Sequence, residues 1–257
     1  MSLKNEYRPI VGGKITLPAS YNDTPIIGIA EFESVPNLTE IYMLDSAQHK
    51  YIANGAFKYN RALKLVKLNK TMETIGNEAF DEDIALEIFE WNDSPVTRIG
   101  TQAFRANGAL KINSLPETVS FIGERAFLNA SSITVSKLPD ALHRVSAQCF
   151  MGCTNSSINT FPSRENACSI SYAAFQNGGA GVNTIRIESP WILNDQGYGN
   201  GIARPFFGGY KSVTSVEVYS NFMREYTDDE GVLDVQAISE ALFGEYRRNV
   251  TYSIING

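Results

Sequence analysis

A short pattern of apolar and polar positions recurs along the chain. Its clearest form is isoleucine, glycine, two variable residues, alanine and phenylalanine, and it occupies residues 75–80, 99–104 and 122–127. Looser copies, and then weaker ones, occupy residues 52–57, 145–150, 170–175, 27–32, 202–207 and 238–243. The phenylalanines of successive copies lie 23 to 25 residues apart, except across the last two intervals of 32 and 36 residues. A period this constant predicts a repeat architecture.

A second apolar stretch follows within eleven residues of each phenylalanine. At residues 63–68 and 213–218, apolar side chains alternate with polar ones closely enough to predict a short strand. A proline recurs twelve residues after the phenylalanine, at Pro116, Pro139 and Pro162. Because proline has no N–H to donate to a sheet, we expect it to mark the end of that strand.

One repeat is therefore predicted to hold a strand, a turn, a short extended piece ending in Ile-Gly, and a helical turn carrying Ala-Phe. The glycine is expected to permit a tight bend, the small alanine to let the turn approach the sheet, and the phenylalanine to fill the interior. Units of about 23 residues cannot bury a core alone, so they must stack. The predicted fold class is an α/β repeat solenoid with short parallel strands and short helical turns, roughly 40 Å long for nine units.

The continuous repeat favours a single domain over residues 1–257. We divide it into an N-terminal cap at 1–30, repeats at 27–220 and an irregular C-terminal cap at 221–257. Caps are expected at both ends because an open solenoid would expose its core and an unpaired strand edge. Within the last quarter, residues 232–243 predict a helix and residues 249–254 predict a closing strand.

The repeat resembles the BspA-like leucine-rich repeats. Residues 110–127 (LKINSLPETVSFIGERAF) follow their consensus closely, Phe150 and Cys153 reproduce its phenylalanine and later cysteine, and residues 14–29 look like the first half-repeat. The resemblance implies a leucine-rich repeat solenoid. It also implies a binding role, since members of this family mostly act as adhesins or binding modules on bacterial and protist surfaces, and similar repeats occur in phage tail proteins. The shared residues face inward, so they do not identify a ligand.

Charge and hydropathy exclude several classes. The chain has 22 basic and 28 acidic residues, a net charge of −6, and so lacks the basic surplus typical of nucleic-acid binding. No apolar run approaches the roughly 20 residues that span a bilayer, so no membrane insertion is expected. The first residues contain no apolar segment typical of a signal peptide. Either the protein is not exported by that route, or a signal has been removed.

No constellation of residues points to catalysis or to a cofactor. The two histidines, His49 and His143, are not in repeat register with a serine or cysteine, and His143 is expected to be exposed. Cys149 takes the alanine position of its repeat and is expected to be buried as a small apolar residue. Too few cysteines and histidines lie near it to form a zinc site. We therefore expect no enzyme activity, no metal and no cofactor.

The strongest candidate for a contact site is an insertion at residues 191–201 in the first long interval. Tryptophan and tyrosine are enriched at interface hot spots, and insertions in solenoids often lie on the binding face. The candidate partner-binding residues are Trp191, Asn194, Asp195, Tyr198, Arg204, Tyr210 and Tyr219. The alternative is that Trp191 packs against an irregular repeat.

The sequence favours a non-enzymatic module for protein binding or assembly. Our first expectation is a phage virion component in the tail or fibre, in contact with other virion proteins. The alternatives are a bacterial cell-surface adhesin of BspA type that binds a host protein or a glycan, and a cytoplasmic scaffold. The expected location is thus the virion or the extracellular cell surface.

Substitution of a repeated phenylalanine should differ from substitution in the insertion. Phe127→Ala is expected to lower the free energy of unfolding by about 3–5 kcal/mol because it leaves a cavity in the core. Trp191→Ala is expected to spare folding and to weaken partner binding. Chemical denaturation of both variants checks this, and an equal loss of stability would contradict a contact role for Trp191.

Overall fold

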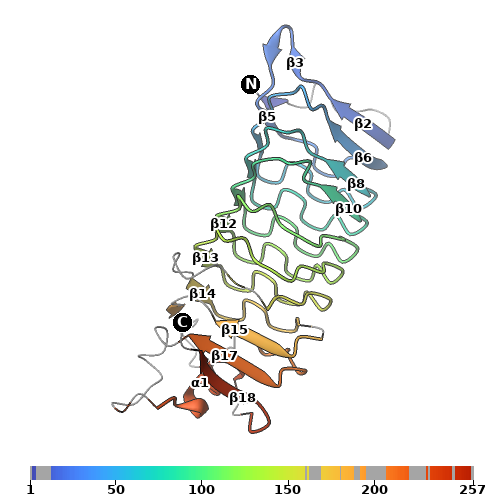
Figure 1. Ribbon diagram of the computed structural model, residues 1–257. Helices are drawn as coiled ribbons and strands as arrows, with labels where there is room; N and C mark the ends of the chain where they lie inside the picture. Colours follow the sequence, from blue (N-terminus) through green and yellow to red (C-terminus); the bar gives the residue numbers. More distant parts are fainter. Residues whose placement is uncertain are drawn as a thin grey trace.

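The computed structural model describes residues 2–3, 13–159, 161, 169–179, 181–187, 192–194, 207–219, 230, 232–244 and 247–255. Successive repeats, which we call coils, stack into an elongated solenoid with the N-terminal coils at one end and the C-terminal coils at the other (Figure 1). The predicted solenoid with parallel strands is thereby confirmed. Capping of its two ends, and the division at residues 30 and 220, stay predictions.

One side of the solenoid is a nine-stranded sheet, which we call the long sheet. Its strands contain only two or three residues each, and every adjacent pair is parallel. In order across the sheet they are β1 (Ser2–Leu3), β5 (Gly28–Ile29), β7 (Tyr51–Ile52), β9 (Thr74–Ile75), β11 (Arg98–Ile99), β12 (Phe121–Ile122), β13 (Arg144–Val145), β14 (Ser169–Ser171) and β16 (Ile192–Asn194).

A second side carries two shorter parallel sheets. The first contains β2 (Gly13–Leu17), β6 (Leu38–Met43), β8 (Leu65–Lys67) and β10 (Ile88–Glu90), and we call it the short sheet. The second contains β15 (Thr184–Ile187), β17 (Ser215–Tyr219) and β18 (Thr251–Ile255). β8, β17 and β18 confirm the strands predicted near residues 63–68, 213–218 and 249–254. Between the two sheets the coils stay connected, as where Thr134 N–H donates to the carbonyl of Ile112 at 2.8 Å.

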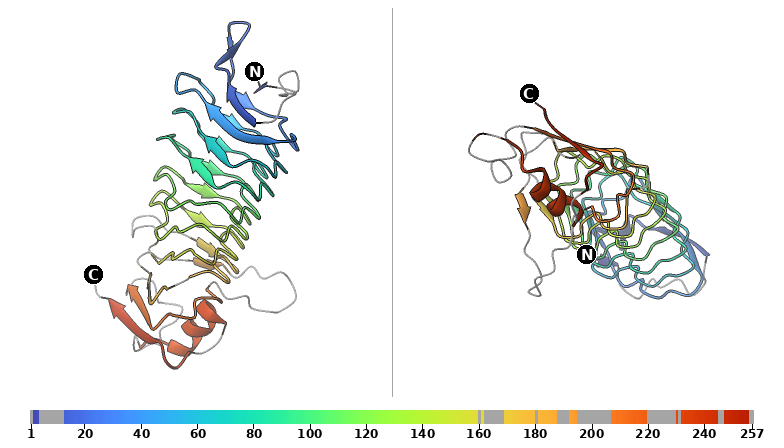
Figure 2. Two further views of the ribbon diagram at one scale, coloured as in Figure 1. Left: turned by 90° about the vertical axis from the view of Figure 1, so that its right-hand side faces the viewer. Right: turned by 90° about the horizontal axis from the view of Figure 1, so that it is seen from below.

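Two local elements stand apart from this pattern. A hairpin of β3 (Ser20–Tyr21) and β4 (Thr24–Pro25) projects at the N-terminal end (Figure 1), and its turn residues Asn22 and Asp23 have φ of 46° and 60°. Positive φ at both central residues is the geometry of the two-residue turns that join antiparallel strands. The helix α1 (Val235–Phe243) lies at the C-terminal end of the stack (Figure 2).

The predicted helix at residues 232–243 is confirmed, but it begins later, at Val235. The Asp234 side chain accepts hydrogen bonds from the N–H groups of Gln236 and Ala237, which fixes the start of α1. Gly244 ends it with φ of 76°. Phe207 N–H donates to the carbonyl of Leu242 at 2.9 Å, so α1 occupies the place of the next coil's turn.

A stack of phenylalanine rings fills the interior. Ring centroids of successive members are 5.1 to 5.8 Å apart, and six of the seven pairs are within 9° of parallel. The members are Phe32, Phe57, Phe80, Phe104, Phe127, Phe150, Phe175 and Phe207, all at most 2% exposed. Beside the rings runs a row of buried side chains from the long sheet, which includes Ile52, Ile75 and Ile99. The repeated apolar residues therefore form the core.

The turns that carry Ala-Phe are not helical, contrary to the prediction. In each, the residue two before the phenylalanine has a left-handed backbone, with φ of 55° at Glu78, Gln102 and Arg125. The residue two after the phenylalanine does the same, as at Glu82 with φ of 59°. For residues other than glycine this conformation costs about 1–2 kcal/mol, so something else must stabilise the turns.

Hydrogen bonds between coils supply that stabilisation. In the turn around Phe104, the N–H groups of Gln102, Phe104 and Ala106 donate to carbonyls of the next coil at 2.8–2.9 Å. The N–H groups of Ala103 and Arg105 instead bond within the turn. The left-handed residues rotate alternate amides outward along the solenoid axis. Each turn therefore pairs with the next one much as a strand would.

Two of the weaker repeat copies are placed differently from the prediction. Ile29, not Ile27, pairs with Ile52 in the long sheet, and Ile27 is 43% exposed. In the eighth coil, Leu193 of β16 pairs with Ile170 and takes the strand position that the repeat pattern assigned to Ile202. The extra residues of the long interval therefore follow the strand, and part of the predicted insertion loop is strand.

The repeated glycine before each turn is needed for space. A Cβ at Gly100 would lie 2.5 Å from the amide nitrogen of Asn77 in the preceding coil, and Gly76 and Gly123 have similarly close neighbours. These three glycines do not have positive φ, so the expected role in a tight bend is corrected to a role in close coil approach.

Gly100→Ala is expected to lower the free energy of unfolding by about 1–3 kcal/mol, because backbone must move to admit the methyl group. Gly108→Ala is the matched control, since its Cβ would meet nothing nearer than Ser131 Oγ at 3.6 Å. Its stability is expected to change by about 0.5 kcal/mol or less. Urea denaturation measures both, and similar values for the two variants would contradict the crowding argument.

Candidate functional site

The outer face of the long sheet presents one side chain per coil. Each two-residue strand turns its isoleucine or valine inward and the preceding residue outward. The outward residues, which we call the outer stripe, are Tyr51, Thr74, Arg98, Phe121 and Arg144. Tyr51 is 39% exposed, Arg98 and Arg144 are exposed, and Thr74 and Phe121 are half-buried. Strand pairing sets Tyr51, Thr74, Arg98 and Phe121 side by side, with Arg144 next.

Two contacts order side chains of the outer stripe. The guanidinium carbon of Arg98 lies 4.0 Å from the ring centroid of Phe121, within the range of a cation–π contact. The Tyr51 ring lies over Gly28 of β5, where an added Cβ would be 2.1 Å from a ring carbon. These side chains are therefore held close to the sheet.

The two arginines of the outer stripe have no carboxylate partner among the described residues. Glu73, on a neighbouring coil, pairs with Lys50 at 2.5 Å, and Glu124 pairs with Arg125 at 3.4 Å. By contrast, Arg61 and Arg186 elsewhere on the surface do have partners, Glu82 at 3.0 Å and Glu217 at 2.7 Å. The outer stripe is thus a local positive area on an acidic protein.

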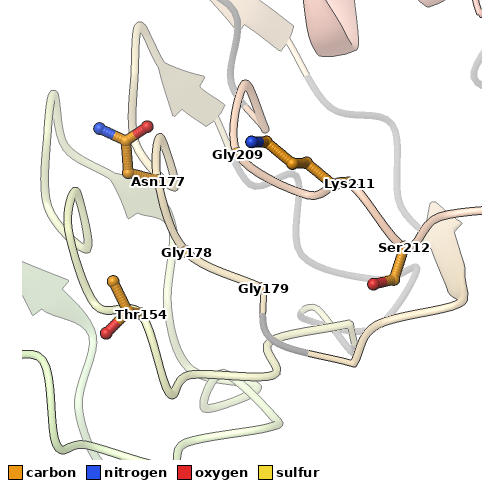
Figure 3. Close-up of a pocket in the computed structure, with 7 residues that line it drawn as sticks. All are labelled: Thr154, Asn177, Gly178, Gly179, Gly209, Lys211 and Ser212. Atoms are coloured by element: carbon orange, nitrogen blue, oxygen red, sulfur yellow. The ribbon is translucent and has the colours of Figure 1, made fainter.

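A hollow of about 380 Å³ lies at the turns of the last coils (Figure 3). It is lined by Thr154, Asn177, Gly178, Gly179, Gly209, Lys211 and Ser212. The described residues of the lining offer hydroxyl, amide and ammonium groups and no carboxylate. The glycines themselves are explained by packing, because a Cβ at Gly209 would lie 2.3 Å from Asn177.

Tyr210, one of the predicted contact residues, lies beneath this hollow. Its side chain is 1% exposed, its ring packs against Gly179, and its hydroxyl donates to the carbonyl of Ile158 at 3.3 Å. Burial raises the pKa of this hydroxyl, so it stays protonated. The ring is therefore inside the protein and offers no surface to a partner.

The other predicted contact residues are described only in part or not at all. Trp191, Asp195, Tyr198 and Arg204 lie outside the described residues. For two further residues only the backbone is described: Asn194 pairs with Ser171 in the long sheet, and Tyr219 ends β17 opposite Ile255. Their role in binding stays a prediction.

The outer stripe was missed in the sequence because its members differ in type. The signal was present as a position, since each residue immediately precedes the repeated isoleucine or valine. An alignment of the repeats on that isoleucine or valine would place Arg98, Phe121 and Arg144 in one column.

Histidines and cysteines are separated in the structure. His143 is exposed, as predicted, whereas His49 is buried with Nε2 at 2.9 Å from the Pro18 carbonyl, and burial lowers its pKa. Cys149 and Cys153 are free and buried, and burial raises the pKa of both thiols.

In the described part of the chain, no three or more His, Cys, Asp or Glu side chains group as metal ligands. No helix there is long and apolar enough to cross a membrane.

Comparison with known families places this repeat. A model of the BspA type leucine rich repeat region, in six copies, matches residues 25–157 and 84–193. The chain belongs to this family. No curated protein sequence matches it.

Two solved leucine-rich structures share the fold. A leucine rich repeat protein from T. pallidum is 22% identical, with a TM-score of 0.51 over 62% of this chain and 72% of that one. A leucine rich cell surface protein from Faecalibacterium prausnitzii is 19% identical, with a TM-score of 0.52 over 86% of this chain. The chain spans half the length of the F. prausnitzii protein. Identities this low establish the fold alone.

One buried column departs from the BspA-type consensus, in which a cysteine stands three residues after the phenylalanine. Cys153 fits it, but Asn60, Asp83 and Asn107 take this position in earlier coils, all at most 1% exposed. Asp83 Oδ1 accepts a hydrogen bond from Asn60 N–H at 2.6 Å, while Oδ2 has no hydrogen-bond partner in the described part of the chain. Burial raises the pKa of this carboxyl well above its usual range, and the nearby Asp81 carboxylate adds to the shift.

This raised pKa makes stability depend on pH. The folded state holds the Asp83 proton more tightly than the unfolded chain does. The contribution of this proton to the free energy of unfolding is therefore complete below about pH 4. It is lost as the pH rises to the folded-state pKa, with a slope of at most about 1.4 kcal/mol per pH unit. Asp83→Asn is expected to remove this loss and to raise the stability at neutral pH.

Urea denaturation of the wild type and the variant between about pH 5 and pH 8 measures the difference. Asp81→Asn is the control. Asp81 forms ion pairs with Lys58 at 3.3 Å and Arg105 at 2.7 Å, so its substitution should lower stability instead. A constant difference between wild type and Asp83→Asn at all pH values would contradict the protonated state of Asp83.

Proposed function

We propose that the chain is a non-enzymatic module that binds a protein partner at a bacterial cell surface. The observation that carries this proposal is the outer stripe. The core uses the inward positions of each coil, whereas the outward positions of the long sheet form a continuous face roughly 40 Å long. Arginine and tyrosine are among the residues enriched in interface hot spots, and both are exposed on this face.

The buried groups support a role without catalysis. A reactive cysteine needs a lowered pKa and access to substrate, but Cys149 and Cys153 are buried and their pKa values are raised. His49 is buried against Pro18, and His143 is exposed on another coil. These residues are explained as core and surface.

The cell surface is favoured as the location by the family. BspA-type repeats are generally protein-binding or surface modules, and the F. prausnitzii structure is described as a cell surface protein. The virion component that the sequence first favoured, and a cytoplasmic scaffold, are the competing outcomes of the test. The activity and partners of the whole protein are part of this proposal.

Location is tested by immunogold electron microscopy on the source culture. An antibody raised against the folded chain is applied to intact cells and, separately, to particles in a filtered lysate. We expect label on intact cells, and we expect trypsin treatment of those cells to remove it. Label on filtered particles would contradict the cell-surface proposal and restore the virion. Label only after the cells are broken would indicate a scaffold.

A further inference from the structure

We propose that Arg98, Phe121 and Arg144 form a contact site for an acidic segment of the protein partner. This inference rests on the proposed function and specifies the chemistry of the partner. It concerns three adjacent strands, β11, β12 and β13, at the middle of the long sheet. None of these residues was singled out by the repeat pattern.

The backbone fixes the spacing of the three side chains. Ile99 pairs with Ile122 and Ile122 with Val145, so the outward residues beside them are also neighbours. Strands in a sheet lie about 4.8 Å apart, which puts the bases of the two arginines about 10 Å apart with the phenylalanine between them. Two carboxylates on one side of an extended segment are about 7 Å apart. The Arg98 guanidinium already lies over Phe121, on the side of Arg144, and the long Arg144 side chain can span the remaining difference.

Charge is what distinguishes this site from the rest of the surface. The whole chain carries −6 and would repel an acidic partner at long range. At physiological ionic strength such repulsion is screened beyond about 8 Å, so contact depends on nearby groups. There, Glu73 and Glu124 already have cationic partners, whereas Arg98 and Arg144 have no carboxylate partner among the described residues. Two carboxylates of a binding partner would supply one ion-pair partner to each arginine.

The phenylalanine ring favours a protein segment over an acidic glycan. Sugars commonly stack on an open aromatic face, but one face of the Phe121 ring is covered by the Arg98 guanidinium at 4.0 Å. That contact instead holds the guanidinium in place, which reduces the entropy lost when a carboxylate binds it in a bidentate pair. The half-buried ring also leaves apolar surface between the two arginines, which the methylene groups of the acidic side chains can cover.

The test uses the full chain and a fluorescent peptide of alternating glutamate and valine, with glutamine in place of glutamate as the control peptide. Fluorescence anisotropy measures the dissociation constant at low and at physiological salt. We expect the acidic peptide to bind more tightly than the control, and more weakly as salt is raised. The variant Arg98→Gln/Arg144→Gln should weaken acidic-peptide binding by about tenfold or more.

The matched control variant is Arg61→Gln/Arg186→Gln. It changes the net charge by the same amount but removes arginines that have partners, Glu82 and Glu217. Its binding should stay within about twofold of the wild type. Thermal melting checks that both variants fold, and an Arg98→Lys/Arg144→Lys variant, which keeps the charge, should retain part of the affinity.

Three results would overturn the inference. The first is equal weakening by both glutamine variants, since net charge alone would then explain binding. The second is no preference of the wild type for the acidic peptide. The third is binding of chondroitin sulfate, through the same two arginines, without binding of the acidic peptide. None of them alters the label on intact cells, so failure here is distinct from failure of the proposed function.

Discussion

The stack of phenylalanine rings and the hydrogen bonds around it hold the coils together. A single coil buries too little to be stable, so its stability comes from its neighbours. The left-handed residues on either side of each phenylalanine are unfavourable alone, yet they direct alternate N–H groups to the next coil. Ring stacking and amide pairing thus require the same coil spacing. That shared requirement explains why six intervals in succession stay within 23 to 25 residues.

This arrangement separates structural positions from positions free for binding. Isoleucine, alanine and phenylalanine point inward, and glycine is held by the backbone of the preceding coil. The residue before each isoleucine has no such constraint, so it can differ from coil to coil without disturbing the stack. Tyr51, Arg98 and Phe121 occupy that position in three of the coils. At the outer stripe, therefore, the residue type can vary to suit a binding partner without loss of core packing.

Sequence reasoning succeeded where one side chain fills one place in every coil. Side-chain size and period were enough to predict the phenylalanine stack, the buried Cys149 and the parallel strands. It failed at the turns because Glu78, Gln102 and Arg125 are not typical of left-handed backbone, which here depends on pairing with a neighbouring coil. The sequence pattern also aligned Ile27 with the repeated isoleucines, because the order of residue types in a motif does not show that Ile29 pairs with Ile52. The outer stripe depends on register between strands, which no single repeat contains.

The hydrogen bonds between coils are tested most directly by amide hydrogen exchange in the native state, followed residue by residue by NMR. The N–H groups of Phe57, Phe80, Phe104 and Phe127, which donate between coils, are predicted to exchange slowly and to a similar extent. The left-handed residues Gln102 and Arg125 should be protected equally. Exchange at these amides at the rate of an unstructured peptide would contradict the coil-to-coil ladder and, with it, the separation between core and outer stripe.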